Sequence, residues 1–403
     1  MVKNSRLWTA WTLPALGVWQ LAAPATFAYQ SSILSWNSWI VGLLLIFLGP
    51  LCRRPAQKMA PWIVLAVGIW MQMAPLLFWA PDAVCCLNDT FSGVWVIALS
   101  FILRPLPGEQ PTSTHCVPPG WSYNPSSGAQ RLPIAALALI CWMFSRYLGA
   151  FELGYIQTVW DPFFGDGTLR VLTSTISKSF PVPDAGLGAL AYTIEFLAAC
   201  QGGADRWKSS PWMVAIFGLL VVPVSLTSVL LIILQPLAVG AWCTICLFTA
   251  AAMLIAIPFA IDEIAASYQL MKRTGWKGFF RGGDTDGTVD ERTPEMDKPI
   301  WKLLKASAWG VSCPWNLILT ALLGIALMFH PIVEDLDPVL GALAVVVSVI
   351  SFAEIARYVR WVNILIAIAL LFSGGFLILH ICAALLIGSL SVRRGHIREC
   401  FFS

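Results

Sequence analysis

The sequence has little charge. Only 12% of its 403 residues are Asp, Glu, Lys or Arg, whereas soluble domains contain about 25% of such residues. Hydrophobic residues make up 58% of the chain. This composition excludes a soluble globular protein and predicts an integral membrane protein. The positions of the 25 basic residues are therefore more informative than the net charge of +3.

Several kinds of functional site lack the residues that they require. The four histidines are His115, His330, His380 and His396, and none has two further ligands at a metal-binding spacing. No phosphate-binding glycine loop, nucleophile elbow or basic patch for nucleic acid is present. The eleven cysteines are too dispersed for a disulfide scaffold. We therefore expect no zinc or iron site and no nucleic-acid partner.

Apolar segments predict an all-α, polytopic membrane protein with about twelve transmembrane helices. These segments begin near residues 11, 36, 60, 89, 131, 184, 211, 239, 313, 338, 360 and 375. If the N-terminus is cytoplasmic, only Arg170 and Lys178 among the basic residues fall in outer loops, and Arg146 lies within a span. We therefore predict the bacterial inner membrane, with both termini cytoplasmic. The last two spans require a turn at residues 373–375.

The first 105 residues contain an internal repeat at an offset of 51 residues. The matched pairs are Trp11/Trp62, Gly17/Gly68, Trp19/Trp70, Ala23-Pro24/Ala74-Pro75, Phe27/Phe78, Asn37/Asn88 and Gly42/Gly93. This pattern of duplicated helical hairpins resembles the SPW repeat of small bacterial membrane proteins. A looser copy, "CPWNLILTALLGIALMFHP" (residues 313–331), predicts a second such unit in 312–392. The alternative is that Trp and Pro only mark membrane interfaces and kinks.

Two cysteines stand three residues apart in the apolar stretch "GAWCTICLFTAA" (residues 240–251). Cys243 and Cys246 are expected at the outer end of the eighth span, with both sulfurs on one face of the first helical turn. Free N–H groups at a helix N-terminus lower the pKa of a thiol, and disulfides persist on the non-cytoplasmic side. The pattern predicts a redox-active pair, with inert buried cysteines as the alternative.

The neighbourhood of this pair strengthens the redox interpretation. The run "VLTSTISKSFPVPDAGLGALAYTIEFLAAC" (residues 171–200), the apolar segment 211–235 and then "WCTICLFTAA" resemble the vitamin K epoxide reductase family over about 130 residues. Members of that family are four-helix bundles around a quinone, to which the helix-borne cysteines pass electrons.

The resemblance implies roles for individual residues. Cys243 and Cys246 would be the redox pair, with Cys246 facing the quinone, and Ser174 matches the family's loop serine. Asp184 occupies the place where relatives have an asparagine that binds a quinone carbonyl. The implied quinone site is completed by Leu187, Tyr192, Trp242 and Phe248.

The sequence also departs from the family. The family's two loop cysteines would fall at about Trp160 and Thr168, and Ala250 stands where several relatives have a tyrosine. Three explanations stay open. A periplasmic thioredoxin-like or other thiol protein reduces the pair directly. Cys85 and Cys86, expected in an outer loop, replace the missing cysteines. In the third explanation, turnover is lost and the bundle binds a quinone, a lipid or a partner as a scaffold. A soft-metal site at the two thiolates is a further rival.

These observations together predict five segments. Residues 1–105 form an SPW-like unit, 106–130 a cytoplasmic linker, 131–260 the reductase-like four-helix bundle, 261–311 a second linker, and 312–403 another SPW-like unit with a basic tail. We predict a membrane thiol-disulfide oxidoreductase that passes electrons from a thiol protein through Cys243 and Cys246 to a quinone.

Two further features of the central segment are candidates for function. Arg146 and Glu195 are expected at comparable depths in neighbouring helices, where they would form an ion pair or relay a proton. The stretch "DPFFGDG" (residues 161–167) is expected to form a turn or a lid over the quinone site rather than a cation site.

Overall fold

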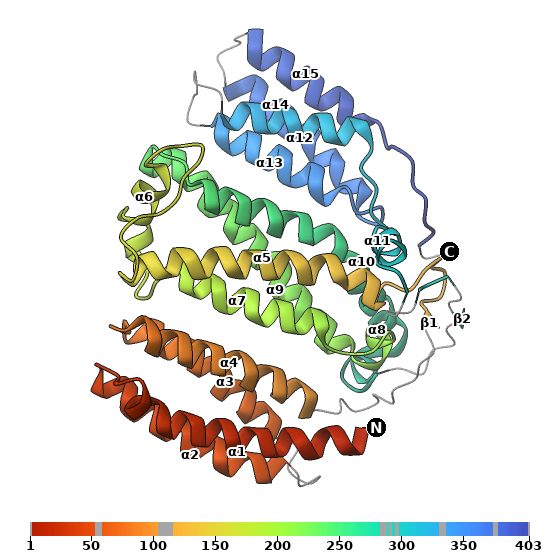
Figure 1. The fold of residues 1–403 in the computed structure, drawn as a ribbon. Helices are drawn as coiled ribbons and strands as arrows, with labels where there is room; N and C mark the ends of the chain where they lie inside the picture. The colour runs from red at the N-terminus through yellow and green to blue at the C-terminus, as the bar shows by residue number, and fades with distance from the viewer. Residues whose placement is uncertain are drawn as a thin grey trace. The chain divides into compact units, whose positions relative to one another are not determined.

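The structure is a computed structural model that describes residues 2–52, 59–103, 116–282, 288–289, 292–294, 298–329, 336–373 and 378–401. Within these ranges the chain forms fifteen α-helices and one two-stranded antiparallel sheet (Figure 1). Contacts divide the chain into two compact units, residues 1–106 with 139–201 and residues 107–138 with 202–403.

The first unit contains two helical hairpins followed by parts of the central segment. Its elements are α1 (Val2–Thr26), α2 (Ser32–Cys52), α3 (Ala60–Leu77), α4 (Ala83–Leu103), the second half of α5 (Gly128–Glu152), α6 (Gly167–Leu172), the 3-10 helix η1 (Ser177–Ser179) and α7 (Asp184–Cys200).

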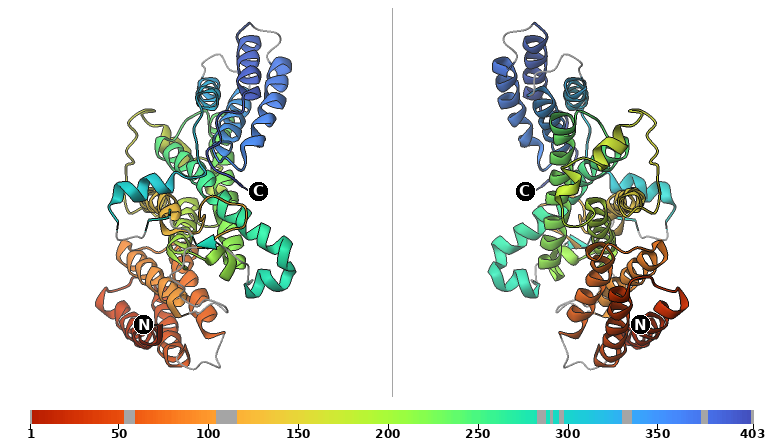
Figure 2. Two further views of the ribbon diagram at one scale, coloured as in Figure 1. Left: turned by 90° about the vertical axis from the view of Figure 1, so that its right-hand side faces the viewer. Right: turned by 90° about the vertical axis from the view of Figure 1, so that its left-hand side faces the viewer.

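The second unit carries the remaining elements, and Figure 2 shows its C-terminal helices in two further views. These elements are β1 (Cys116–Val117), the first half of α5, α8 (Arg206–Ser209), α9 (Pro211–Leu234), the π-helical segment η2 (Gln235–Val239), α10 (Thr244–Arg281), β2 (Thr288–Val289), α11 (Ile300–Ser307), α12 (Trp315–Met328), α13 (Asp337–Ile350), η3 (Arg357–Trp361), α14 (Val362–Ser373) and α15 (Ile378–Val392).

Several helices have the length and composition of membrane spans, and the protein is a multi-pass membrane protein. Among the described residues, six helices are long and apolar enough to cross a bilayer: Ser32–Cys52, Ala60–Leu77, Ala83–Leu103, Gly128–Glu152, Pro211–Val239 and Thr244–Phe280. A helix occurs at each of the twelve expected places, but the number of crossings stays a prediction. The turn expected at residues 373–375 lies largely outside the described residues, between α14 and α15.

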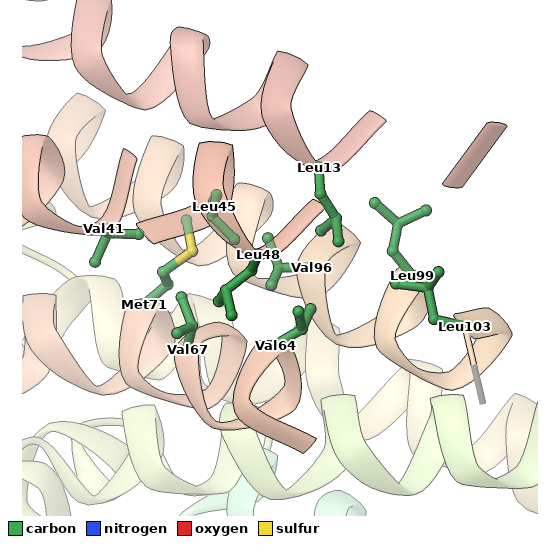
Figure 3. Close-up of a cluster of buried hydrophobic side chains, with 10 residues drawn as sticks. All are labelled: Leu13, Val41, Leu45, Leu48, Val64, Val67, Met71, Val96, Leu99 and Leu103. Carbon is green, nitrogen blue, oxygen red and sulfur yellow. The ribbon is translucent and has the colours of Figure 1, made fainter. Parts of the chain in front are cut away.

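Helices α1 to α4 share one apolar core (Figure 3). It consists of Leu13, Val41, Leu45, Leu48, Val64, Val67, Met71, Val96, Leu99 and Leu103. Lipid chains are as apolar as these side chains, so within a bilayer the helices associate through close packing rather than through exclusion of water. This requirement for close packing explains the recurring glycines of the repeat.

Glycine pairs let the helices of three hairpins cross with their backbones in contact. The crossings pair Gly17 with Gly42, Gly68 with Gly93, and Gly324 with Gly341. A Cβ atom on Gly17 would lie 2.6 Å from the carbonyl oxygen of Gly42, and one on Gly324 would lie 2.6 Å from that of Gly341. Small residues at such crossings are typical of membrane helices. The third crossing, in α12–α13, supports the second SPW-like unit predicted from the sequence.

The two N-terminal hairpins exchange hydrogen bonds through their repeated Trp and Asn residues. The Trp19 indole donates to Asn88 Oδ1 at 2.8 Å, and the Trp70 indole donates to Asn37 Oδ1 at 2.7 Å. Each bond joins one hairpin to the other. The repeat pattern therefore encodes the pairing of the hairpins as well as each hairpin.

The two segments expected to be linkers are partly folded. In the first segment, Trp121 and Tyr123 are buried, and β1 pairs with β2 of the second segment. Helix α10 extends well past the expected end of the bundle at residue 260 and reaches Arg281 after a kink at Gly275. The described parts of both segments therefore bury side chains that a solvated linker would expose. Residues 104–115, 283–287, 290–291 and 295–297 lie outside the described residues.

A buried polar cluster joins these segments to α8 and α10. The Arg206 guanidinium donates two hydrogen bonds to the Glu263 carboxylate, at 2.5 and 2.6 Å, and both side chains are buried. The Tyr123 hydroxyl donates to Asp262, and burial together with this carboxylate raises the pKa of Tyr123 well above its usual value of 10.0. Buried charges require such partners, so the cluster fixes the middle of α10, at residues 262–263.

Candidate redox site

The connection between α9 and α10 places the cysteine pair at a helix start. Helix α9 continues into η2, and Gly240 then reverses the chain with a φ of 64°, a left-handed conformation that favours glycine. Cys243 is the N-cap residue of α10. The predicted position of the pair in the first helical turn agrees with this geometry.

The two cysteines form a disulfide bond, with their Cα atoms 5.3 Å apart. The sulfur of Cys243 also accepts the backbone N–H of Cys246 at 3.1 Å. Cys243 has 0% of its surface exposed, whereas Cys246 is half-buried. The helix N-terminus thus directs an N–H group at Cys243, which is the environment that stabilises a thiolate after reduction.

The side chain of Gln235 forms a hydrogen bond that restrains the turn between η2 and α10. Its side-chain Oε1 accepts the backbone N–H of Cys243 at 2.9 Å, and the Gln235 side chain is itself buried. Sequence reasoning did not single out this residue. The available signal was an amide side chain in an otherwise apolar helix, eight residues before the first cysteine.

Cys246 lies against an apolar wall. This cluster consists of Ile232, Ile233, Ala250, Met328 and Ala342, with Trp242, Cys246 and other half-buried residues packed against it. The Trp242 ring is also packed on Phe329, with centroids 4.7 Å apart. Phe248 is 46% exposed. These surroundings fit an apolar ring such as a quinone on the Cys246 side of the pair.

The other predicted site residues lie in the first unit. The Ser174 hydroxyl accepts the backbone N–H of Ser177 at 3.3 Å. Asp184 begins α7, and its carboxylate accepts the hydroxyl of Ser177 at 3.4 Å. Leu187 is half-buried and Tyr192 is buried, one and two turns further along α7. The structure therefore brings Ser174 and Asp184 together around Ser177.

Asp184 has a second partner that sequence reasoning missed. The carboxyl groups of Glu152 and Asp184 are hydrogen-bonded to each other. Glu152 in turn accepts the backbone N–H of Ala185 at 3.1 Å and the hydroxyl of Ser177 at 3.2 Å. Asp184 thus belongs to a local polar network at the start of α7, whereas the resemblance assigned it to a quinone carbonyl.

The expectation that Cys85 and Cys86 lie in an outer loop is wrong. Both belong to the first turn of α4, which begins at Ala83, and they are 0% and 4% exposed. The helix starts earlier than the apolar pattern indicated. Neither thiol presents the accessible surface that a shuttle for a partner protein needs.

Arg146 and Glu195 do not form the expected ion pair. The Arg146 guanidinium donates to the Thr90 hydroxyl at 2.8 Å, and both oxygens of the buried Glu195 carboxylate have no hydrogen-bond partner. Arg146 is six residues from the end of α5, whereas Glu195 is eleven residues from the start of α7. Glu195 instead lies near Cys141, five residues before Arg146 on α5, a rise of about 7.5 Å along the helix.

The loop from residue 161 to 167 is organised by one aspartate. Asp161 Oδ1 accepts the backbone N–H groups of Phe163 and Phe164, and Oδ2 accepts the N–H and the hydroxyl of Thr168. The side chains at the positions of the family's loop cysteines are thus an exposed Trp160 and a buried Thr168 bound to Asp161. Among the described residues, no three His, Cys, Asp or Glu side chains are grouped as metal ligands.

Fold and site together define a helical, multi-pass membrane protein with a Cys-x-x-Cys disulfide at the start of a membrane helix. Residues 132–261 match the vitamin K epoxide reductase family, and residues 7–103 match the SPW repeat domain. Both resemblances predicted from the sequence are therefore confirmed. No curated protein and no solved structure gave a significant match to the chain.

Proposed function

We propose that the protein is a membrane thiol-disulfide oxidoreductase that takes electrons from a thiol protein and passes them through Cys243 and Cys246 to a membrane quinone. The observation that carries this proposal is the disulfide between Cys243 and Cys246 at the N-terminus of α10, within the segment that matches the reductase family. The coarser conclusion, a thiol oxidoreductase-like membrane domain, rests on that family match.

The proposed cycle transfers two electrons and two protons. A partner dithiol reduces the disulfide by exchange through a mixed disulfide, which leaves the partner oxidised and both cysteines as thiols. A bound quinone would accept the two electrons and two protons from these thiols, and the Cys243–Cys246 bond would form again. We assign delivery to the quinone to Cys246, because its half-buried sulfur lies against the apolar cluster.

Entry of the partner at Cys243 requires a change in the turn before α10. Cys243 is fully buried in the disulfide form, so its sulfur cannot be attacked there unless the backbone from Gly240 to Cys243 moves. The Gln235–Cys243 hydrogen bond restrains that movement. When the partner's second thiol then attacks the mixed disulfide, Cys243 leaves as a thiolate, and the N–H of Cys246 stabilises that thiolate.

The pair is tested by single substitutions in the purified full-length protein. With Cys246→Ala we expect quinone reduction by a dithiol to fall by at least about a hundredfold, because one thiol cannot complete the two-electron exchange. Cys382→Ala, at an exposed free cysteine, is the control and should keep full activity. Unchanged quinone reduction in Cys246→Ala would disprove the mechanism.

The order of the two cysteines is tested by trapping. In Cys246→Ala the Cys243 thiol can attack the disulfide of the oxidised partner, which forms a mixed disulfide and releases one partner thiol, whereas Cys243→Ala offers only the Cys246 thiol. We expect trapping with Cys246→Ala to exceed trapping with Cys243→Ala. The reverse result would place entry at Cys246.

The restraint by Gln235 gives a separate test. Gln235→Leu keeps a side chain of similar size but cannot accept the N–H of Cys243. We expect the disulfide of this variant to react about three- to tenfold faster with a small dithiol, because the lost bond is worth about 1 kcal/mol. An unchanged rate would show that the bond does not control access.

A second candidate function is a binding scaffold without turnover. It is favoured by Trp160 and Thr168 at the positions of the family's loop cysteines and by the burial of Cys85 and Cys86. Thiol alkylation of membranes from aerobic cells distinguishes the two functions. A pair that is protected until a reductant is added supports the oxidoreductase, and a pair that is alkylated directly supports the scaffold.

The location is part of the same proposal. We place the chain in a bacterial inner membrane with cytoplasmic termini, which puts Cys243 at the periplasmic face and makes a periplasmic thioredoxin-like protein the partner. A topology reporter inserted between Gly240 and Trp242 tests this placement. A cytoplasmic signal there would contradict it.

A further inference from the structure

A cavity of about 350 Å³ lies within the first unit, among α3, α4, α5 and α7. Its volume is at the lower end of the range for ligand pockets, about 300–1,000 Å³. The cavity is lined by SPW-repeat helices on one side and by central-segment helices on the other, and neither cysteine of the Cys243–Cys246 pair lines it. It is therefore a site separate from the redox pair.

Two polar side chains of the cavity, Arg146 and Gln72, offer hydrogen-bond donors. Arg146 lines it, and one of its N–H groups donates to the Thr90 hydroxyl at 2.8 Å. Among the described residues, no carboxylate lies within ion-pair distance of this guanidinium. The Cys86 thiol, which also lines the cavity, is a second hydrogen-bond partner of the Arg146 side chain. A guanidinium has five N–H donors, so it has donors for an oxyanion in addition to these two contacts. In a membrane helix an unneutralised charge is costly.

Gln72 supplies a second, independent donor. It also lines the cavity, it is 3% exposed, and its amide nitrogen has no hydrogen-bond partner. Its amide oxygen lies 3.5 Å from the Thr193 hydroxyl, so the carbonyl side of the amide is the occupied one. An unpaired buried N–H₂ group costs about 1–3 kcal/mol unless an acceptor reaches it.

The donors lie deeper than most of the apolar lining. Gln72 is five residues before the end of α3, Thr90 seven residues after the start of α4, and Arg146 six residues before the end of α5. These spacings correspond to a common depth of about 8–10 Å from the helix ends. Leu153 and Ile156 line the cavity beyond the end of α5. The polar donors are thus deep and the apolar lining is nearer the helix ends. A phospholipid with its headgroup at the membrane surface would require the opposite arrangement.

We propose that this cavity binds a single-chain amphiphile whose anionic head, a carboxylate or a phosphate monoester, contacts Arg146 and Gln72. A guanidinium forms paired, charge-assisted hydrogen bonds with such oxyanions, and the Gln72 amide donates an additional bond. The apolar lining holds the part of the chain nearest the head. Thr90 positions the guanidinium through its hydroxyl.

The proposal is tested with the full-length protein in nanodiscs and three probes of equal chain length. These are palmitate, hexadecyl phosphate and hexadecanol. Native mass spectrometry measures the amount of each probe bound at increasing concentration. We expect at least one anion to bind about tenfold or more tightly than hexadecanol. The comparison of palmitate with hexadecyl phosphate distinguishes the two sources of the head. Equal binding of hexadecanol and both anions would overturn the proposal.

Variants assign the binding to the cavity. Arg146→Gln should weaken binding of the anion about tenfold or more, and Gln72→Leu should weaken it about threefold to tenfold. Arg170→Gln, which removes an exposed positive charge of the same unit outside the cavity, is the matched control and should bind as the parent does. Unaltered binding in both cavity variants would overturn the assignment.

A third measurement holds even if Arg146→Gln does not fold. Saturating anion should raise the melting temperature of the parent protein, whereas hexadecanol should not. The redox proposal does not depend on this outcome, because its tests measure quinone reduction and trapping at Cys243 and Cys246.

Discussion

The hairpins α3–α4 and α12–α13 carry the same buried residue at the same place but use it differently. Each has an aspartate four residues before the second glycine of its crossing, Asp89 before Gly93 and Asp337 before Gly341. Both aspartates are buried. A carboxylate at this depth needs a hydrogen-bond partner, and the partner comes from a neighbouring helix in each case.

The partners of the two aspartates differ. Asp89 Oδ1 accepts hydrogen bonds from the Gln20 amide and the Tyr29 hydroxyl, both at 3.1 Å. Asp337 contacts the imidazole of His380 in α15, with each carboxylate oxygen 3.0 Å from Nε2. In both hairpins this aspartate therefore links the hairpin to a neighbouring segment. The residues of that segment determine whether the partner is an amide and a hydroxyl or an imidazole.

The hairpins also differ in the residues that pair them. Trp19 and Trp70 each stand two residues after the first crossing glycine, and Ala326 stands at the corresponding place in α12. In the N-terminal hairpins the repeated Asn stands five residues before the second crossing glycine. The equivalent position in the third hairpin is Leu336, which directly precedes α13. The third hairpin therefore keeps the glycine crossing and lacks both partners of the Trp–Asn bond.

The largest effect is expected where the aspartate is linked to a histidine. His380→Leu should lower the stability by about 3–5 kcal/mol, because it leaves the buried Asp337 carboxylate without its partner. His396→Leu, at an exposed position, is the matched control and should change stability little. Thermal unfolding in detergent measures both. Equal stability of the two variants would show that the Asp337–His380 contact does not hold α15.

The glycine crossing should be the next most sensitive feature. Gly324→Ala places a Cβ 2.6 Å from the Gly341 carbonyl oxygen, so we expect a loss of about 1–3 kcal/mol. In Gly388→Ala the added atom lies 3.6 Å from Ala367, an ordinary contact, and the gain in helix propensity is up to about 1 kcal/mol. If Gly324→Ala is as stable as Gly388→Ala, the close crossing is not required.

Substitution of the two Asn residues of the N-terminal repeat is expected to lower stability by different amounts. The amide of Asn88 donates to Gln20 and Tyr29 in addition to accepting from Trp19, whereas Asn37 accepts a single bond, from Trp70. Asn88→Leu should cost about 1–3 kcal/mol and Asn37→Leu about 0.5–1.5 kcal/mol. Equal losses in chemical denaturation would mean that the additional bonds of Asn88 contribute nothing.

The smallest effect is expected from restoring the missing partners. The substitutions are Ala326→Trp and Leu336→Asn, both at exposed positions. The Trp–Asn hydrogen bonds of the N-terminal unit need two hairpins that both carry the pattern, and the double variant supplies only one. We expect the double variant to lie within about 0.5 kcal/mol of the parent. A larger stabilisation would indicate that the new Trp and Asn bond to each other within one hairpin.

Sequence reasoning located the features that depend on local spacing. The Cys-x-x-Cys pair at a helix start, the duplicated hairpins and both family resemblances follow from residues close together in the chain. The crossing glycines could be found in the same way, because both glycines of a crossing lie within one hairpin and recur in the next.

The features that were missed join residues far apart in the sequence. Neither the Arg206–Glu263 pair nor the Asp337–His380 contact has a local signal, since each depends on which helices become neighbours. The error at Cys85 and Cys86 has a different origin. There the apolar pattern placed the start of the helix at residue 89, whereas α4 begins at Ala83.

The first half of α10 fixes the distance between its start and Glu263. Cys243, which precedes its first residue, and Glu263 are twenty residues apart on one continuous helix, a rise of about 30 Å, which equals the hydrocarbon thickness of a typical bilayer. This part of the helix is therefore long enough to cross the hydrocarbon layer once. Determining which leaflet borders the disulfide would at the same time place the Arg206–Glu263 pair at the opposite leaflet, so one accessibility measurement locates both features.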